Sequence, residues 1–269
     1  MIKRQLLTEI QRFSHKKKAI IVLGPRQVGK TTLIKTLMGS DEYLLLNGDD
    51  SAVARQLSEA DTFKIKQIIG NHSKVFVDEA QKINNIGNTL KIISDQMPHV
   101  ELFISGSSTL EMNQATQEPL TGRKFEFELF PISWKEFENH IGYLNAENQL
   151  EHRLVYGMYP DVLNDPTIET KTLKNLTQSY LYQDILALAG IRKPDILDRL
   201  LTALALQIGS EVSYNELSQL LQIDKGTVIK YINLLEQSFI IFTLPSFSRN
   251  LRNEIKNNRK IYFYDNGIR

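Results

Sequence analysis

Short apolar runs alternate with stretches of helical periodicity over the first half of the chain. The apolar runs cover residues 19–23, 43–46, 74–77, 101–104 and 124–129. The segments between them, such as residues 90–96, have the apolar spacing of crossover helices. Strands that alternate with helices in this way are typical of a parallel sheet with helices on both faces. We therefore predict a doubly wound α/β domain.

The pattern changes after residue 131. Helical periodicity dominates from residue 133 to about residue 206, and the Tyr159-Pro160 and Asp165-Pro166 pairs mark turns within it. A third segment begins near Glu211. We predict three parts: an α/β core over residues 1–131, a helical lid over 132–208 and a last unit over 209–269.

The last unit has the pattern of a winged helix-turn-helix. Ser213 and Glu216 have the spacing of a capping box before an apolar helix face. A connection over residues 222–226 leads to a second helix over 227–236, and a β-rich run follows at 239–244. Two short helices followed by a strand favour this fold.

A phosphate-binding loop follows the first predicted strand directly. The pattern GxxxxGK[ST] needs glycines so that backbone N–H groups point at phosphates, a lysine for the β- and γ-phosphates and a hydroxyl for Mg²⁺. The alternative is a plain strand-to-helix turn, but here a strand precedes the motif and an amphipathic run follows it. The predicted nucleotide-binding residues are Gly24, Pro25, Arg26, Gln27, Val28, Gly29, Lys30, Thr31 and Thr32.

A second nucleotide motif ends the strand at 74–77 with two carboxylates. We predict that Asp78 holds Mg²⁺ together with Thr31, and that Glu79 acts as general base on the attacking water, with Lys30 facing the transferred phosphate. The alternative is an acidic pair at a helix N-terminus, where the dipole favours carboxylates.

Two further candidates lie beyond these motifs. Ser105 or Ser107, at the end of the next strand, has the position of a sensor of the γ-phosphate, although a Gly/Ser turn that caps a helix has the same composition. Ser107 is our catalytic candidate. Arg123 precedes the last predicted strand, where it either serves a neighbouring subunit as an arginine finger or holds the loop through an internal carboxylate.

Composition adds limits rather than a function. The chain has 269 residues, a net charge of +1 and no cysteine, which excludes disulfides and thiolate metal sites. Residues 1–10 mix charges with apolar positions at helical spacing, and no apolar run has the length of a membrane span. We expect a cytoplasmic protein with no membrane partner.

These motifs together resemble a known family. GPRQVGKTT, VFVDEAQ, FISGSS and the LTGR to FELFPISWKEF segment are similar to the AAA-type ATPases of archaea and bacteria that carry a C-terminal domain of unknown function. YGMYPDVL, residues 179–185, the helix-turn-helix and KIYFYDNGI extend the resemblance over nearly the whole chain. It implies an additional-strand ATPase core, a helical lid, a winged helix and ATP hydrolysis.

The sequence departs from that family in two ways. Members usually continue past the segment Asp265-Asn266-Gly267 into a domain with a restriction-endonuclease-like appearance, whereas this sequence ends at Arg269, so we assign no nuclease. Arg153, Arg192 and Arg199 are all candidates for a lid arginine, and none lies in a matching motif.

Two functions compete at this point. The first is a Mg²⁺-dependent, ATP-hydrolysing switch that exchanges ATP and ADP and assembles with copies of itself. The second is an ATP-regulated DNA-binding protein with negligible turnover, in which Lys225, Thr227 and Lys230 reach the duplex. Residues 248–269 hold six basic against two acidic side chains, which gives local cationic character. Winged helices in such ATPases also serve as packing modules, so DNA binding stays open.

Overall fold

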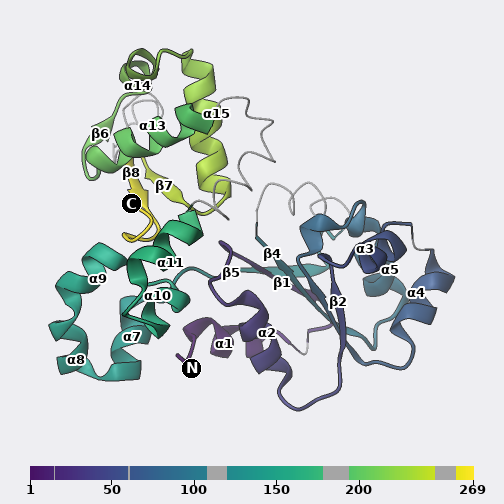
Figure 1. Cartoon of the computed structure of the whole chain (residues 1–269). Helices are drawn as coiled ribbons and strands as arrows, with labels where there is room; N and C mark the ends of the chain where they lie inside the picture. Colours follow the sequence, from purple (N-terminus) through teal and green to yellow (C-terminus); the bar gives the residue numbers. More distant parts are fainter. Residues whose placement is uncertain (15, 60, 108–119, 178–193, 246–258) are drawn as a thin grey trace, which may run out of the picture. The chain divides into compact units, whose positions relative to one another are not determined.

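The computed structural model describes the chain except for residues 15, 60, 108–119, 178–193 and 246–258. It consists of two compact units, Met1–Ile141 and Gly142–Arg269 (Figure 1). The first unit continues past residue 131, because the helix that follows the last strand belongs to it. None of the described helices is long and apolar enough to cross a membrane.

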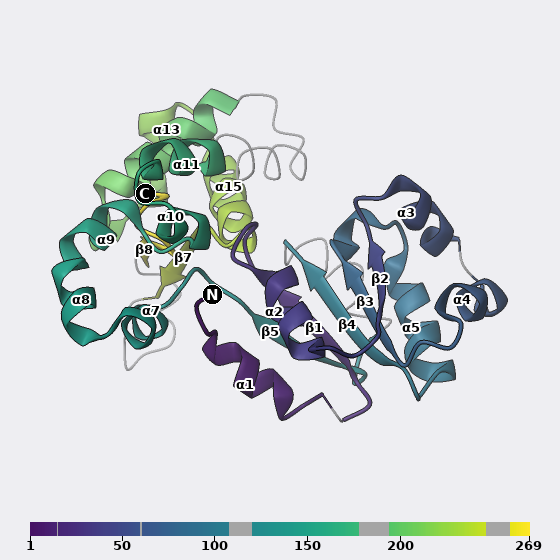
Figure 2. The ribbon, with the colours of Figure 1, turned by 60° about the horizontal axis from the view of Figure 1, so that its bottom comes forward.

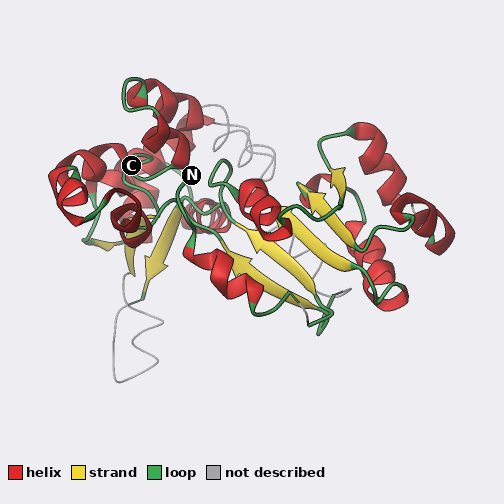
Figure 3. Cartoon of the chain, turned by 90° about the horizontal axis from the view of Figure 1, so that it is seen from below, coloured by secondary structure: helices red, strands yellow, loops and turns green. Residues whose placement is uncertain are grey.

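The first unit is built on one five-stranded sheet in which all neighbouring strands are parallel (Figure 3). All five predicted strands are present, and their ends agree with the prediction to within two residues. The order β2-β3-β4-β1-β5 places β1 and β4 in the middle, and all five residues of β1 are buried. The strands are β1 (Ala19–Leu23), β2 (Leu44–Asn47), β3 (Lys74–Asp78), β4 (Glu101–Gly106) and β5 (Lys124–Glu128).

The connections place helices on both faces of this sheet. The crossover from β1 to β2 runs in one direction along the sheet, and those from β2 to β3 and from β3 to β4 run in the other. Because such crossovers are right-handed, α2 covers one face and α3, α4 and α5 cover the other (Figure 2). The helices are α1 (Gln5–Gln11), α2 (Lys30–Met38), α3 (Ser51–Ser58), α4 (Thr62–Ile69), η1 (Ala80–Lys82), α5 (Ile86–Gln96) and α7 (Trp134–Ile141).

The N-terminal segment is fixed to the edge of the sheet. Its helix α1 contacts α2, and Ile10 is fully buried. Phe13 packs against Phe125 and Phe127 of β5, with ring centroids 4.8 and 5.6 Å apart. Aromatic side chains bury large apolar areas, so these contacts stabilise the position of the segment that precedes β1.

The second unit combines short helices with a three-stranded antiparallel sheet of order β6-β8-β7. Ser213 caps the first helix of the predicted helix-turn-helix by accepting the Glu216 N–H. The elements are α8 (Tyr143–Asn148), α9 (Leu150–Tyr156), α10 (Pro160–Asn164), α11 (Glu169–Asn175), α13 (Pro194–Leu206), β6 (Glu211–Val212), α14 (Tyr214–Leu221), α15 (Lys225–Gln237), β7 (Ile241–Leu244) and β8 (Arg259–Phe263).

Two details of the second unit differ from the sequence prediction. Helix α15 begins at Lys225, because Asp224 is its N-cap and accepts the Thr227 N–H at 2.9 Å. The predicted connection over 222–226 was therefore too long. Strand β8 is not among the strands that the sequence predicts, although it lies between β6 and β7 and completes their hydrogen bonding.

A buried carboxylate joins two distant segments of this unit. Asp265 accepts the N–H groups of Met158 at 2.7 Å and of Gly267 at 2.9 Å, and only 5% of its surface is exposed. Burial raises the pKa of Asp265, while these donors act in the opposite direction. A Cβ on Gly157 would lie 2.0 Å from Asp265 Oδ1. The segments YGMYPDVL and KIYFYDNGI therefore meet at a position that only glycine fits.

We predict that Gly157→Ala destabilises the second unit more than Gly142→Ala does. Both glycines have positive φ, 72° and 86°, with ψ in the region that other residues avoid, which costs about 1–3 kcal/mol. Only Gly157 also meets the carboxylate, which adds about 1–3 kcal/mol through the lost hydrogen bonds of Asp265. Urea unfolding of the two variants measures the loss of stability that each substitution causes. Equal losses would contradict a specific role for the Asp265 contact.

Candidate functional site

The loop between β1 and α2 has the backbone of a phosphate cradle. Gln27 and Gly29 have positive φ, 62° and 94°, so the chain reverses its curvature just before the helix. Gly24 has a φ of 152°, and a Cβ there would lie 2.0 Å from the carbonyl oxygen of Leu129. Glycine at position 24 therefore permits the loop to pass directly beside the end of β5. Alternating backbone conformations of this kind direct successive N–H groups to one side.

The lysine of the motif lies at the start of the helix that the loop opens. Lys30 is the first residue of α2, with only 5% of its surface exposed, and its Nζ donates to the carbonyl oxygens of Gly24 at 2.9 Å and Pro25 at 2.8 Å. The ammonium group is thus held over the mouth of the loop, where the helix dipole adds positive potential. Of the other predicted residues, Val28 is buried and Thr32 is exposed.

The two motifs meet through a carboxylate with two hydroxyl donors. Thr31 Oγ1 donates to Asp78 Oδ2 at 2.9 Å, and Ser105 Oγ donates to Asp78 Oδ1. The sheet order explains this arrangement, because β4 lies between β1 and β3 and brings Ser105 beside the end of β3. Asp78 is largely buried, with 9% of its surface exposed. Thr31 and Asp78 therefore lie together, as the sequence predicts.

The neighbouring glutamate has its own polar contacts. Glu79 has a φ of 50°, and its N–H donates to Ser105 Oγ at 3.2 Å. Gln81 Nε2 donates both to Glu79 Oε2 at 2.6 Å and to Ser107 Oγ at 2.9 Å. One amide group thus joins the two catalytic candidates Glu79 and Ser107. The other amide atom, Gln81 Oε1, is buried and has no hydrogen-bond partner among the described residues.

Each half of the chain matches the model of a known domain family. Residues 16–138 match the model of an AAA domain, and residues 147–269 match a domain of unknown function, DUF8612. Residues 16–138 therefore form an AAA-type P-loop ATPase domain. The structure of a Walker-type ATPase from Pyrococcus abyssi has the same fold, with a TM-score of 0.67 at 15% identity over 100% of this chain and 95% of that one. The resemblance inferred from the motifs is confirmed.

The curated relatives of this chain are longer and are themselves described as uncharacterized. A Haemophilus influenzae protein is 24% identical over 93% of this chain and 68% of its own length. Relatives from Methanocaldococcus jannaschii and Mycobacterium tuberculosis, also 24% identical, match 85% and 99% of this chain. The chain spans 56% and 58% of the lengths of these two relatives.

Arg123 of the AAA-type domain lies at the amino-terminal ends of the parallel strands, whereas the phosphate loop lies at their carboxyl ends. It directly precedes β5, whose first residue pairs with Ala19 at the start of β1. At about 3.3 Å per residue, the five residues of β1 separate these two ends of the sheet by roughly 16 Å. Arg123 Nε donates to Asp95 at 2.5 Å, and both side chains are partly exposed. Within one subunit, this contact matches the internal-carboxylate interpretation.

Sequence reasoning missed two contributors to the site. Gln81 lies in the VFVDEAQ segment, but no general pattern assigns a role to the glutamine. Arg4 lies far from any motif, and its guanidinium donates to the carbonyl oxygen of Val28 in the phosphate loop at 2.8 Å. Only tertiary structure reveals that contact.

The lid arginine remains without an assignment. Arg153 is buried against Glu169, and Arg199 donates to the carbonyl oxygen of Leu220 at 2.9 Å, so both have partners within the second unit. Arg192 lies outside the described residues, as do residues 179–185 of the quoted motifs.

Proposed function

We propose that this chain binds and hydrolyses MgATP and acts as an AAA-type molecular switch. The observation that carries the proposal is the hydrogen-bonded group at the carboxyl edge of the sheet, where Thr31 and Ser105 both donate to Asp78. Lys30 and the positive-φ loop lie at the same edge of the sheet. These are the groups that bind phosphates and a divalent cation in P-loop proteins.

The residues at this edge fit a magnesium ion. Mg²⁺ prefers hard oxygen ligands and usually keeps several waters, so one hydroxyl and one carboxylate suffice from the protein. Thr31 Oγ1 and the Asp78 carboxylate are 2.9 Å apart and provide this pair. The bound ion would neutralise charge on the β- and γ-phosphate oxygens. Asp78 and Thr31 would hold it, while Lys30 contributes a positive charge.

Glu79 is the proposed general base. It follows the metal-binding carboxylate directly, and its left-handed backbone turns the chain away from the strand, so that Asp78 and Glu79 serve different partners. We assign Ser107 to sensing of the γ-phosphate, because Gln81 joins it to Glu79 through bonds of 2.9 and 2.6 Å. A general base must lie within hydrogen-bond reach of its water, and this pair of contacts restricts where the carboxylate points.

The second unit supplies the parts that a switch would move. We assign a helical lid to residues 142–208 and a winged helix to residues 209–269, on the basis of α14, α15 and the sheet β6-β8-β7. A two-state element with different affinity for ATP and ADP is what converts hydrolysis into motion. A homo-oligomer is part of this proposal, since Arg123 reaches a nucleotide only in another subunit.

DNA binding is the second candidate, and one observation favours it. Lys225 and Lys230 are both exposed on α15, the helix in the position of a recognition helix. Arg259 and Lys260 of β8 are also exposed. These four cationic side chains could contact DNA phosphates. Such contacts do not by themselves distinguish one base sequence from another.

The first prediction from the proposed function separates nucleotide binding from chemistry. Lys30→Ala should abolish MgATP binding, because it removes the cation that faces the phosphates. Glu79→Gln should keep the affinity and lose turnover, because the amide cannot accept the proton of the water. Equilibrium binding and steady-state hydrolysis measure the two effects. Hydrolysis by Glu79→Gln at the rate of the unmodified protein would show that Glu79 is not the base.

The second prediction tests Arg123 as an arginine finger against its pairing with Asp95. As a finger, Arg123→Ala should lower turnover by about 10³-fold or more. Asp95→Ala removes the same contact but leaves the guanidinium in place, so its turnover should stay near that of the unmodified protein. The activity should also rise with protein concentration as subunits assemble. If both variants lose the same stability and neither loses turnover, Arg123 has only a structural role.

The third prediction concerns Lys225 and Lys230. If each neutralises a DNA phosphate, the double substitution to Gln should weaken duplex binding for all sequences and lower the log-log salt slope by about two units. If they only face solvent, the stability should change by no more than about 0.5 kcal/mol. Titration of a labelled duplex at two salt concentrations, with and without MgATP, distinguishes these results. Absence of salt-sensitive binding would leave α15 as a packing helix.

A further inference from the structure

A single arginine from the N-terminal segment reaches the back of the phosphate loop. Arg4 directly precedes α1, and only 11% of its side chain is exposed. Its Nη1 donates to the carbonyl oxygen of Val28 at 2.8 Å, and its Nη2 donates to the carbonyl oxygen of Phe130 at 2.5 Å. Its Nε donates to Glu136 Oε1 at 3.2 Å. One side chain therefore joins the phosphate loop, the exit of β5 and helix α7.

The carboxylate behind this arginine is equally well satisfied. Glu136 has 6% of its side chain exposed, and its Oε1 also accepts the N–H of Gln5 at 2.7 Å. Its Oε2 accepts the Ser133 N–H at 2.9 Å. Burial lowers the pKa of Arg4, and the charge of Glu136 acts in the opposite direction. A buried arginine needs a counter-charge, and Glu136 provides it. The N–H groups of Gln5 and Ser133 in turn hold the Glu136 carboxylate in place.

The bond to Val28 fixes the orientation of one peptide group in the loop. The peptide unit is planar, and in the trans form its C=O and N–H point in opposite directions. Because Arg4 holds the Val28 carbonyl on the outer side, the Gly29 N–H must point to the other side. That side is the concave one, since Gly29, with a φ of 94°, is the N-cap of α2 and the loop curls around this helix start.

The second bond ties the same guanidinium to the strand that supports the loop. Phe130 follows Leu129, whose N–H donates to the carbonyl oxygen of Leu23 at 2.7 Å and whose own carbonyl lies against Gly24. The exit of β5 thus contacts the loop at its first glycine, and through Arg4 at Val28. The loop is braced from outside at both of its ends.

We propose that Arg4, backed by Glu136, is a positioning residue for the nucleotide phosphates: it holds the Val28–Gly29 peptide with its N–H directed into the phosphate loop. The inference rests on the proposed nucleotide binding and adds to it a residue outside both nucleotide motifs. Arg4 itself does not touch the phosphates in this role. It acts through the backbone that does.

Arginine suits this position better than lysine does. The planar guanidinium presents donors in a fixed fork, so that three acceptors in different directions are satisfied at once. A lysine at position 4 keeps the charge opposite Glu136, but its flexible point charge does not hold Val28 and Phe130 at the same time. Arg4→Lys therefore separates the charge from the geometry.

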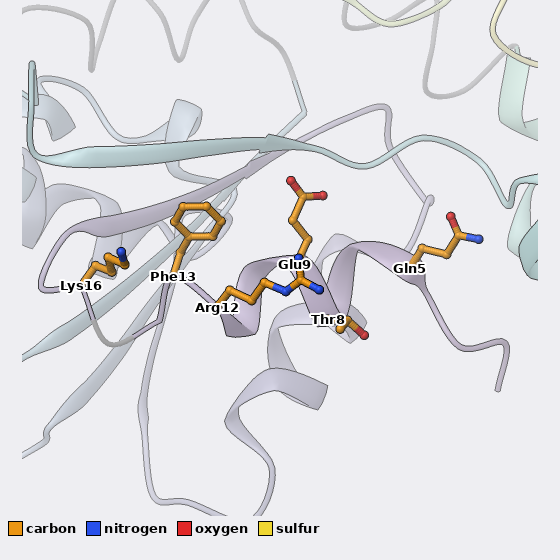
Figure 4. Close-up of a pocket in the computed structure, with 6 residues that line it drawn as sticks. All are labelled: Gln5, Thr8, Glu9, Arg12, Phe13 and Lys16. Atoms are coloured by element: carbon orange, nitrogen blue, oxygen red, sulfur yellow. The ribbon is translucent and has the colours of Figure 1, made fainter.

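The experiment compares three variants of the full chain. Arg4→Ala removes the brace, Arg4→Lys keeps only the charge, and Arg12→Ala is the matched control. Arg12 belongs to the same N-terminal segment and is exposed, where it lines a shallow pocket with Gln5, Thr8, Glu9, Phe13 and Lys16 (Figure 4). The Kd values for MgATP and MgADP are measured by equilibrium titration well below the melting temperature of each variant, and KM and kcat by steady-state hydrolysis.

Arg4→Ala should raise the Kd for both ATP and ADP by about tenfold or more, because backbone N–H groups of the loop cradle phosphates that both nucleotides share. KM should rise in parallel while kcat changes by less than about threefold, since Glu79 and Asp78 are untouched. Arg4→Lys should recover thermal stability but not affinity. Arg12→Ala should bind as the unmodified protein does.

Three outcomes overturn the inference. If the unmodified chain binds ATP and Arg4→Ala binds it equally well at a lower melting temperature, Arg4 has only a structural role and the proposed function stands. If Arg4→Lys restores the affinity fully, the charge and not the orientation of the peptide matters. If the unmodified chain binds no nucleotide, the proposed function itself fails and this inference fails with it.

Discussion

The position of β4 between β1 and β3 determines the geometry of the whole site. The phosphate loop follows β1 and the two carboxylates end β3, so the two motifs lie on strands that are not neighbours. The end of β4 fills the gap with serines, and Ser105 donates to Asp78 while accepting the N–H of Glu79. A carboxylate buried between strands needs such donors, because leaving it unsatisfied would cost about 3 kcal/mol. The same strand order brings Ser107 within reach of Gln81.

Much of this arrangement could be predicted from local patterns. The five strands of the sheet, the phosphate loop and the pairing of Thr31 with Asp78 are consequences of apolar runs and of motifs whose chemistry is local. The N-caps Ser213 and Asp224 show the limit of such reasoning. The spacing of Ser213 to Glu216 indicates the first cap, whereas the pattern around Asp224 predicts a connection, so the predicted start of α15 is two residues late. Strand β8 depends on partners that are distant in the sequence, and its own residues do not alternate regularly.

Contacts between distant segments were beyond sequence reasoning for a physical reason. The guanidinium of Arg4 meets residues 24 and 126 positions away, and nothing in a charged N-terminal helix indicates which carbonyl it will find. Asp265 and Gly157 in the second unit present the same situation, since the glycine is needed only because a carboxylate from far along the chain approaches it. In both cases a buried polar side chain forms hydrogen bonds with backbone groups that lie outside the helices and strands. Such groups almost always have a partner in native proteins, yet local sequence does not identify it.

The backbone of the site adds a constraint that no motif records. Gln27 and Glu79 both lie in the left-handed region, with φ of 62° and 50°, although neither is glycine. Each such residue costs about 1 kcal/mol or more relative to an ordinary conformation, and it persists only where neighbouring contacts determine the backbone. For Glu79, those contacts are the bond from its N–H to Ser105 and the bond from Gln81 to its carboxylate. Gln27 stands beside Val28, which Arg4 holds from the outer side. The strained residues thus lie next to the groups that bind phosphate and water in the proposed reaction, and the polar contacts around them oppose their relaxation.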